Sequence, residues 1–199
     1  MPGRRRPPQN RPPPNHHGFH VLRDPAVVRA LVRSAGLGPG DLVLDLGAGP
    51  GALTVALART GARVIAVERD PRLARRLDRR TADDPAVRVV EGDLRTVTLP
   101  HRPFHVVANI PFATGTDILR RLLDTHDRGR PLRGADLLVE WGFARRLGAA
   151  PADRTTAGWH RRFRIEVARR VPARAFSPPP RVDAAHLVIR RRDARHGPG

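Results

Sequence analysis

The apolar residues of this chain of 199 residues fall into short, nearly continuous runs that alternate with helical patterns. Five runs have the composition of strands covered on both faces: 41–47, 62–68, 86–93, 104–110 and 135–141. Three intervening segments place apolar side chains at helical spacing: 51–60, 71–80 and 115–126. This alternation predicts an open, mostly parallel sheet with helices on both faces.

The pattern weakens after Trp141. Segments 161–173 and 184–192 are expected to form two late strands, joined through the proline-rich stretch "FSPPPRV", which brings the sheet to seven strands. With 40% hydrophobic residues, a chain of this length can bury one sizeable core, so we expect a single α/β domain of Rossmann-like architecture. Trp141 and Trp159 are interpreted as core or hinge residues.

The chain is strongly basic, because it has 37 basic residues, all of them arginine, and 19 acidic ones, which give a formal net charge of +18. A charge of this size attracts polyanions, of which nucleic acid is the leading candidate, although a merely solvated basic surface is the alternative. The arginines cluster at 75–80, 145–146, 161–164, 169–170 and 190–192. The nine histidines show no metal-ligand spacing, so no metal site is expected.

The N-terminal stretch is basic and proline-rich but has no apolar segment of the kind that secretory signals need. We expect residues 1–15 to form a flexible arm and residues 16–199 the catalytic domain. Through Arg4, Arg5, Arg6 and Arg11 the arm could lie along phosphates, or it could be a plain tail. The chain has no cysteine and no apolar run long enough to span a bilayer, which favours a cytoplasmic protein without membrane contact.

Glycines and acids gather where the predicted strands end, which is where open parallel sheets bind ligands. In "DLGAGPG" (45–51), Gly47, Gly49 and Gly51 allow a sharp turn and a close backbone approach to a ligand. Glu68 closes the next strand, where a carboxylate can accept hydrogen bonds from both ribose hydroxyls, and Asp93 follows the third, in reach of an adenine amino group. The glycines also satisfy the dinucleotide-binding pattern, so a nicotinamide-dependent oxidoreductase remains an alternative.

The fourth strand ends in "ANIPF", which places an amide, a rigid turn and an aromatic ring together. The Asn109 side-chain oxygen and the Ile110 carbonyl can accept both hydrogens of an adenine amino group, which frees its delocalised lone pair for attack. Pro111 fixes the turn, and Phe112 can stack on a base taken out of its helix. Asparagine cannot act as a base at neutral pH, so the expected chemistry is positioning and charge stabilisation. A plain turn is the alternative.

In order and spacing, the segments "DLGAGPGALT", "VIAVERD", "EGDL", "VVANIPF", "TDILRRLL", "LLVEWGFARRL" and "VPARAFSPPPRVDAAHLVIRR" resemble the S-adenosylmethionine-dependent rRNA adenine N6-methyltransferases. Within them, "TDI-RR" and "VE-GFA-RL" resemble the erythromycin-resistance (Erm) branch, which modifies large-subunit rRNA. The resemblance runs from about residue 18 to residue 192. It implies the class I methyltransferase fold, S-adenosyl-L-methionine as cofactor and 23S rRNA as substrate.

Carried over by position, the resemblance assigns two sets of residues. Those expected to contact the cofactor are His20, Leu22, Gly47, Ala48, Gly49, Gly51, Glu68, Arg69, Asp93, Leu94 and Asn109. Those expected to hold the adenine are Asn109, Ile110, Pro111 and Phe112, with Phe176 in "FSPPP" as a second aromatic wall.

Two features depart from the family pattern. In "GFHVLRD" only His20, Leu22 and Asp24 match the family's segment that closes over the cofactor. The family's C-terminal helical domain is expected to be absent, which leaves RNA binding to the arginines of the catalytic domain and the arm.

The expected enzyme acts as a monomer on 23S rRNA before the ribosome is fully assembled, and confers macrolide-type antibiotic resistance. A small-subunit rRNA adenine dimethyltransferase and a non-catalytic RNA-binding protein are further alternatives.

Overall fold

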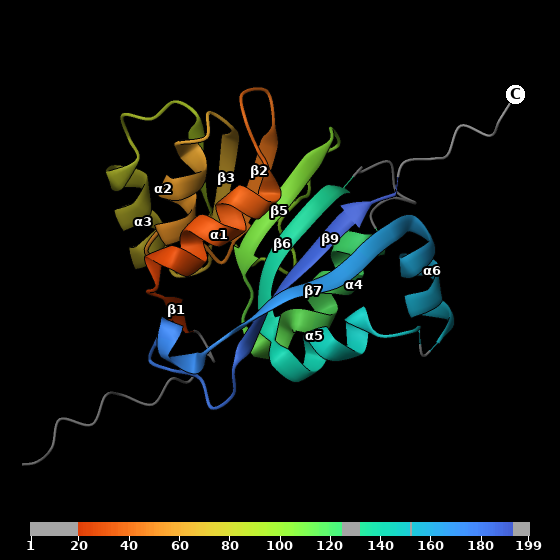
Figure 1. Cartoon of the computed structure of the whole chain (residues 1–199). Coiled ribbons are helices and arrows are strands. Elements are labelled where there is room, and N and C mark those ends of the chain that lie inside the picture. The colour runs from red at the N-terminus through yellow and green to blue at the C-terminus, as the bar shows by residue number, and fades with distance from the viewer. Residues whose placement is uncertain (1–19, 125–131, 152, 193–199) are drawn as a thin grey trace, which may run out of the picture.

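A seven-stranded sheet forms the centre of the computed structural model, which describes residues 20–124, 132–151 and 153–192 (Figure 1). The strand order is β4–β3–β2–β5–β6–β9–β7, and within this sheet only β9 runs against the others. The strands are β2 (Leu42–Leu46), β3 (Arg63–Glu68), β4 (Val87–Glu91), β5 (Phe104–Asn109), β6 (Leu132–Glu140), β7 (Phe163–Val171) and β9 (Ala184–Arg191). The predicted mostly parallel, Rossmann-like sheet is therefore confirmed.

Burial explains why the inner strands could be predicted from the sequence. Every residue of β2 is buried, because helices cover both of its faces and β3 and β5 flank its edges. The edge strand β4 is only partly buried.

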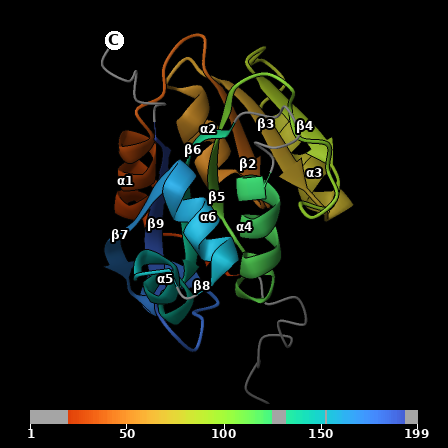
Figure 2. The ribbon, with the colours of Figure 1, turned by 90° about the vertical axis from the view of Figure 1, so that its right-hand side faces the viewer.

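One face of the sheet is covered by α1 (Pro25–Ala35), α2 (Ala52–Ala58) and α3 (Pro71–Arg80), whose side chains Leu31, Leu57 and Leu77 are buried. The other face carries α4 (Gly115–Leu123), α5 (Trp141–Gly148) and α6 (Arg154–Arg162), which lie in front of the sheet in Figure 2. A hydrophobic cluster lies on each face of the sheet, and a smaller one lies under α3 around Leu77.

The C-terminal third differs in detail from the predicted elements. The late strand expected at 161–173 begins at Phe163, and the preceding residues form α6, capped by Asp153 through a hydrogen bond from the Thr156 N–H. Trp159 on α6 is a core residue, 5% exposed, whereas Trp141 begins α5 and is only partly buried.

A second, two-stranded sheet lies beside the carboxyl ends of the main strands (Figure 1). It pairs β1 (Val21–Leu22) with β8 (Phe176–Ser177), so that Leu22 stands opposite Phe176. Among the described residues, a short 3-10 helix follows β5, η1 (Phe112–Thr114), and another precedes β8, η3 (Ala173–Ala175). The pairing of β1 with β8 brings the beginning of the described chain to the end of β5.

The predicted arm, residues 1–15 with its four arginines, lies outside the described residues. Within the described part of the chain, no helix combines the length and the apolar character that crossing a bilayer requires.

Candidate functional site

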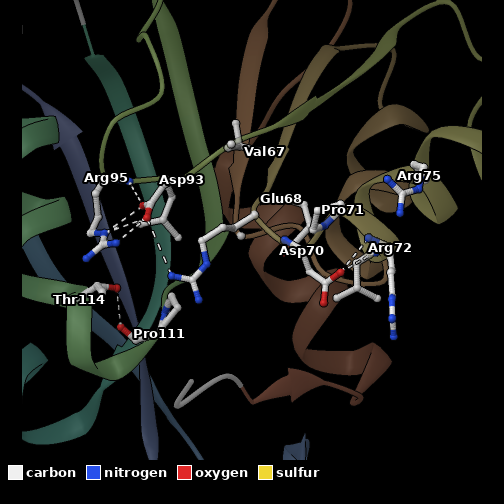
Figure 3. A pocket seen from close by; sticks show the side chains of 15 residues that line it. Val67, Glu68, Asp70, Pro71, Arg72, Arg75, Asp93, Arg95, Pro111 and Thr114 are labelled. Atoms are coloured by element: carbon white, nitrogen blue, oxygen red, sulfur yellow. Dashed lines mark hydrogen bonds and ion pairs between the residues drawn. The ribbon is translucent and has the colours of Figure 1, made fainter. Parts of the chain in front are cut away.

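A cavity of about 710 Å³ opens at the carboxyl ends of β2, β3 and β4 (Figure 3). Its lining comes from the glycine loop, the end of β3 with the start of α3, the segment after β4, and the turn after β5. The lining residues are Gly47, Val67, Glu68, Arg69, Asp70, Pro71, Arg72, Leu73, Arg75, Gly92, Asp93, Leu94, Arg95, Pro111 and Thr114. The cavity therefore joins four strand ends that the sequence had singled out.

The glycine loop is bonded to the end of β3. The N–H groups of Gly47 and Ala48 both donate to the Val67 carbonyl, at 2.8 and 3.0 Å. Gly47 has φ +78°, and a Cβ there would lie 3.4 Å from Leu94 and 3.8 Å from the Asn109 carbonyl oxygen. The loop thus sets the backbone of Gly47 against both the segment after β4 and the end of β5, as a ligand-binding turn requires.

Glu68 connects this loop to α3. Its side chain is 7% exposed; Oε2 accepts the Gly49 N–H at 2.7 Å, and Oε1 accepts the Asp70 N–H at 2.8 Å. A carboxylate offers about four acceptor positions, so each oxygen retains capacity for a further hydrogen bond. Glu68 therefore holds the loop in place and still offers acceptors to the cavity, the role predicted for it toward a ribose.

Asp93 lies across the cavity, and Arg95 contacts it from the side (Figure 3). Arg95 Nη2 is 2.5 Å from Asp93 Oδ2, and the Arg95 backbone N–H donates to Oδ1 at 2.8 Å. The hydrogen bonds from Arg95, with the charge of Arg69 at 4.0 Å, lower the pKa of Asp93 to about 2. Asp93 is thus an ionised acceptor that shares its charge with two cavity arginines, a pairing that sequence reasoning did not anticipate.

The corner formed by "NIPF" contacts the segment that precedes β1. Asn109 Nδ2 donates a hydrogen bond of 2.7 Å to the His20 carbonyl oxygen. The His20 ring lies 5.9 Å from the Phe112 ring at a tilt of 47°, and its Nδ1 is 2.7 Å from the Pro178 carbonyl oxygen. No described residue donates to Asn109 Oδ1, so this atom remains an available acceptor.

The turn after Asn109 is held on both sides. Ile110 is 1% exposed and donates its N–H to the Leu138 carbonyl on β6 at 3.0 Å. Pro111 has φ −56° and lines the cavity, and its carbonyl accepts the Thr114 hydroxyl at 3.0 Å. The turn is therefore rigid, as the proline predicted.

Several predicted site residues have their side chain or Cβ position in the core, Ile110 and Ala48 among them. Phe176 is 4% exposed and Leu22 is 5% exposed, and both belong to the cluster on the α1 face. The Phe176 ring is therefore not presented to a base in this conformation. A Cβ at Gly51 would overlap Leu77 Cδ1, so this glycine is required by packing against α3, and it does not line the large cavity.

Asp45 is a site residue that sequence reasoning missed. It is 1% exposed; Oδ2 accepts the Thr54 hydroxyl at 2.7 Å, and Oδ1 has no hydrogen-bond partner among the described residues. Burial, reinforced by the charge of Glu68, raises the pKa of Asp45 to about 7 despite the Thr54 hydrogen bonds. Its signal was an acid inside an apolar strand, at the first position of "DLGAGPG".

Comparisons with known proteins agree with this geometry. A family model described as "Ribosomal RNA adenine dimethylase" matches residues 14–199. Among solved structures, the 23S rRNA methyltransferase ErmE superposes with a TM-score of 0.80 at 31% identity, covering 87% of this chain and 70% of that one.

Three curated relatives show the same similarity. The rRNA adenine N-6-methyltransferase of Bacillus licheniformis is 33% identical over 91% of this chain and 63% of its own length. The small-subunit methyltransferase A of Synechococcus sp. (strain JA-3-3Ab) is 38% identical over 92% and 68%. The mycinamicin-resistance protein MyrB of Micromonospora griseorubida is 42% identical over 89% and 55%. The chain thus spans less than two thirds of the length of the first and third of these relatives.

Proposed function

Because this chain belongs to the ribosomal RNA adenine dimethylase family, we propose that it methylates the N6 amino group of an adenine in ribosomal RNA. The methyl donor in this proposal is S-adenosyl-L-methionine. The observation that carries the proposal is the bond from Asn109 Nδ2 to the His20 carbonyl, which leaves the amide oxygen as an acceptor. Asn109 lines a small pocket that shares Gly47 with the large cavity, and Pro111, two residues on, lines the large cavity itself.

The chain's residues fit the proposed cofactor. The cavity combines the buried carboxylate of Glu68, the ionised carboxylate of Asp93 and the backbone of Gly47. These groups suit ribose hydroxyls, an adenine amino group and a part of the cofactor that lies close to the backbone. Glu68, Asp93 and Gly47 would hold the cofactor at these points, with Arg69 and Leu94 beside them. When bound, S-adenosyl-L-methionine supplies a methyl group on a sulfonium, which is open to attack by a nitrogen lone pair.

The corner residues act on the target adenine. Asn109 Oδ1 and the Ile110 carbonyl accept the two amino hydrogens, which draws the nitrogen toward tetrahedral geometry and makes its lone pair available. Phe112 stacks on the base, and Pro111 keeps the accepting atoms in place. The amide takes up no proton, so the proton that the nitrogen loses passes to solvent after methylation.

We infer 23S rRNA as the substrate, in a form that precedes complete ribosome assembly, with the chain acting as a monomer in the cytoplasm and conferring macrolide-type resistance. The identity to MyrB and the superposition on ErmE support this substrate and resistance. The net charge of +18 supports an RNA substrate in general. A small-subunit rRNA substrate is the second candidate, favoured by the 38% identity to the Synechococcus enzyme.

The test compares cells with and without the protein by mapping methylated adenines in both ribosomal RNAs. Methylation confined to 23S rRNA supports the proposal, and methylation confined to the small-subunit RNA favours the second candidate. Calorimetry adds an independent readout, because an oxidoreductase would bind NAD rather than S-adenosyl-L-methionine. Absence of methyl transfer to either RNA contradicts the enzymatic proposal altogether.

A further inference from the structure

A tryptophan and an arginine form a stacked pair at the edge of the sheet that carries Asn109. The Arg170 guanidinium carbon lies 5.3 Å from the centre of the Trp141 ring. The indole is partly buried against the core of the α4 face, while 61% of the Arg170 side chain is exposed. Trp141 thus covers one side of Arg170, and much of the arginine remains open to solvent.

A β-bulge in β7 turns Arg170 toward Trp141. Val167 pairs with Leu187 and Arg169 with His186, so one extra residue, Ala168, interrupts the ladder between them. After the bulge, Arg170 is paired with Ala185, whose side chain belongs to the cluster on the α4 face. The Arg169 side chain therefore lies on the other face of the sheet.

Asp183 fixes both members of the pair. Its Oδ2 accepts a hydrogen bond from Arg170 Nε at 2.7 Å, and its backbone carbonyl accepts one from the backbone N–H of Trp141 at 3.0 Å. Its Oδ1 accepts the Ala173 N–H at 2.8 Å, which orients the carboxylate. We call Trp141, Arg170 and Asp183 the Arg170 platform: a guanidinium plane whose Nε edge and one face are already occupied.

The platform lies within reach of a strand of RNA that presents a base to Asn109. Asn109 pairs with Leu138, Leu138 with His186, and His186 with Arg169, so these residues form one row across the sheet. Arg170 follows the last residue of this row and points to the other face of β7. Three strand spacings of about 4.8 Å separate β5 from β7, or about 14 Å in all. That is the length of about four stacked nucleotides.

We propose that the open face of the Arg170 guanidinium stacks on an unpaired base of the RNA strand that carries the target adenine. Guanidinium planes and aromatic rings are the usual surfaces on which proteins stack single-stranded bases. An exposed ion pair contributes little to stability, so the bond to Asp183 is better explained as orientation of the plane than as reinforcement of the fold. This inference rests on the proposed function, because it takes RNA as the substrate.

The experiment measures RNA affinity for the full chain and two variants of equal charge. Arg170→Lys keeps the charge but loses the plane, and Arg169→Lys is the matched control on the opposite face of the same strand. The probes are a short single-stranded RNA with a central adenine, and the same RNA in which every nucleotide except that adenine is abasic. We expect Arg170→Lys to bind the intact RNA about tenfold more weakly, and Arg169→Lys to bind it within about twofold of the parent chain.

On the abasic RNA, the parent chain and Arg170→Lys should bind alike, because no base is left to stack. The inference is overturned if Arg170→Lys binds the intact RNA as tightly as the parent chain, or if its loss is equally large on the abasic RNA, which would assign Arg170 to a phosphate. Methyl transfer by the parent chain is measured in parallel. If the parent chain methylates RNA and Arg170→Lys binds RNA as tightly as the parent chain, only the platform is rejected. If the parent chain methylates no RNA, the proposed function is rejected.

Discussion

The side-chain amide of Asn109 and the backbone carbonyl of His20 are 89 residues apart in the chain and share a hydrogen bond of 2.7 Å. The bond fixes the orientation of the amide, because the nitrogen is engaged and the oxygen is left to face a substrate. It also depends on the small β1–β8 sheet, which carries the chain to the end of β5. A residue at one strand end thus gains its orientation from a segment that no local pattern connects to it.

Removal of the Asn109 amide should strongly reduce methyl transfer and leave cofactor binding largely intact. We expect Asn109→Ala to lower methyl transfer by about a hundredfold or more, as loss of a positioning and polarising group does. The affinity for S-adenosyl-L-methionine should stay within about tenfold, since Glu68 and Asp93 are untouched. Single-turnover methylation and calorimetry measure the two quantities, and undiminished turnover would contradict the role of Asn109.

A change at Glu68 should affect folding as well as binding. In Glu68→Gln one acceptor becomes a donor, which faces the N–H of either Gly49 or Asp70. We expect the free energy of unfolding without cofactor to fall by about 1–3 kcal/mol, the cost of an unsatisfied buried group, and the affinity for S-adenosyl-L-methionine to fall too.

Glu166→Gln is the matched control, because this glutamate is 46% exposed and pairs with Arg164 at the surface. Its effect should be close to zero in urea denaturation. If Glu68→Gln unfolds at the same urea concentration as the parent chain, Glu68 does not hold the glycine loop.

The sequence sufficed for the parts of the fold whose signal is local. The inner strands are buried on both faces, so they appear as apolar runs, and the ends of β2, β3, β4 and β5 supplied the cavity residues Gly47, Glu68, Asp93 and Pro111. Helix α6 was not predicted because Trp159 is its one buried residue, which leaves hardly any helical periodicity in the sequence.

Two of the missed contacts in the site are tertiary, and the third is a local pair of exposed side chains. The bond from Asn109 to His20, the pairing of Asp93 with Arg95 and the burial of Phe176 opposite Leu22 depend on how distant segments or exposed side chains settle. Nothing in the spacing of "FSPPP" distinguishes a ring that lines a site from one that closes the core.

Two glycines of the same loop should respond differently to alanine. Gly47 and Gly51 both have positive φ, +78° and +86°, so the backbone strain of a Cβ is similar at the two positions. At Gly51 the new methyl also overlaps Leu77, whereas at Gly47 it lies at ordinary contact distance from Leu94. We expect Gly51→Ala to be the less stable variant in thermal unfolding, by about 1–3 kcal/mol.

Gly47→Ala should instead show the greater loss of affinity for S-adenosyl-L-methionine, because its methyl enters the cavity. Calorimetry on the folded fraction of each variant separates the two effects. Equal stability of the two variants would mean that α3 moves to accommodate the methyl, and would reject a packing role for Gly51.

The buried carboxyl of Asp45 should make stability depend on pH. Its pKa is about 7 in the folded chain, against 3.8 for an ordinary aspartate. Between these values the folded chain retains a proton that the unfolded chain has lost. The contribution of Asp45 to the free energy of unfolding therefore falls as the pH rises from about 4 to about 7, and levels off on either side.

Asp45→Asn cannot ionise and lacks this contribution. Relative to the parent chain, the variant should gain stability as the pH rises across that window, by up to about 4 kcal/mol at 1.36 kcal/mol per pKa unit. The groups common to both proteins cancel in this difference, including His105, whose pKa is lowered by burial, and Asp93, which titrates at about 2. Urea denaturation at several pH values, without cofactor, measures the difference directly. A gap between the two proteins that stays constant from about pH 4 to about pH 8 would show that Asp45 is already ionised in the folded chain, and that its unpartnered oxygen has found a donor.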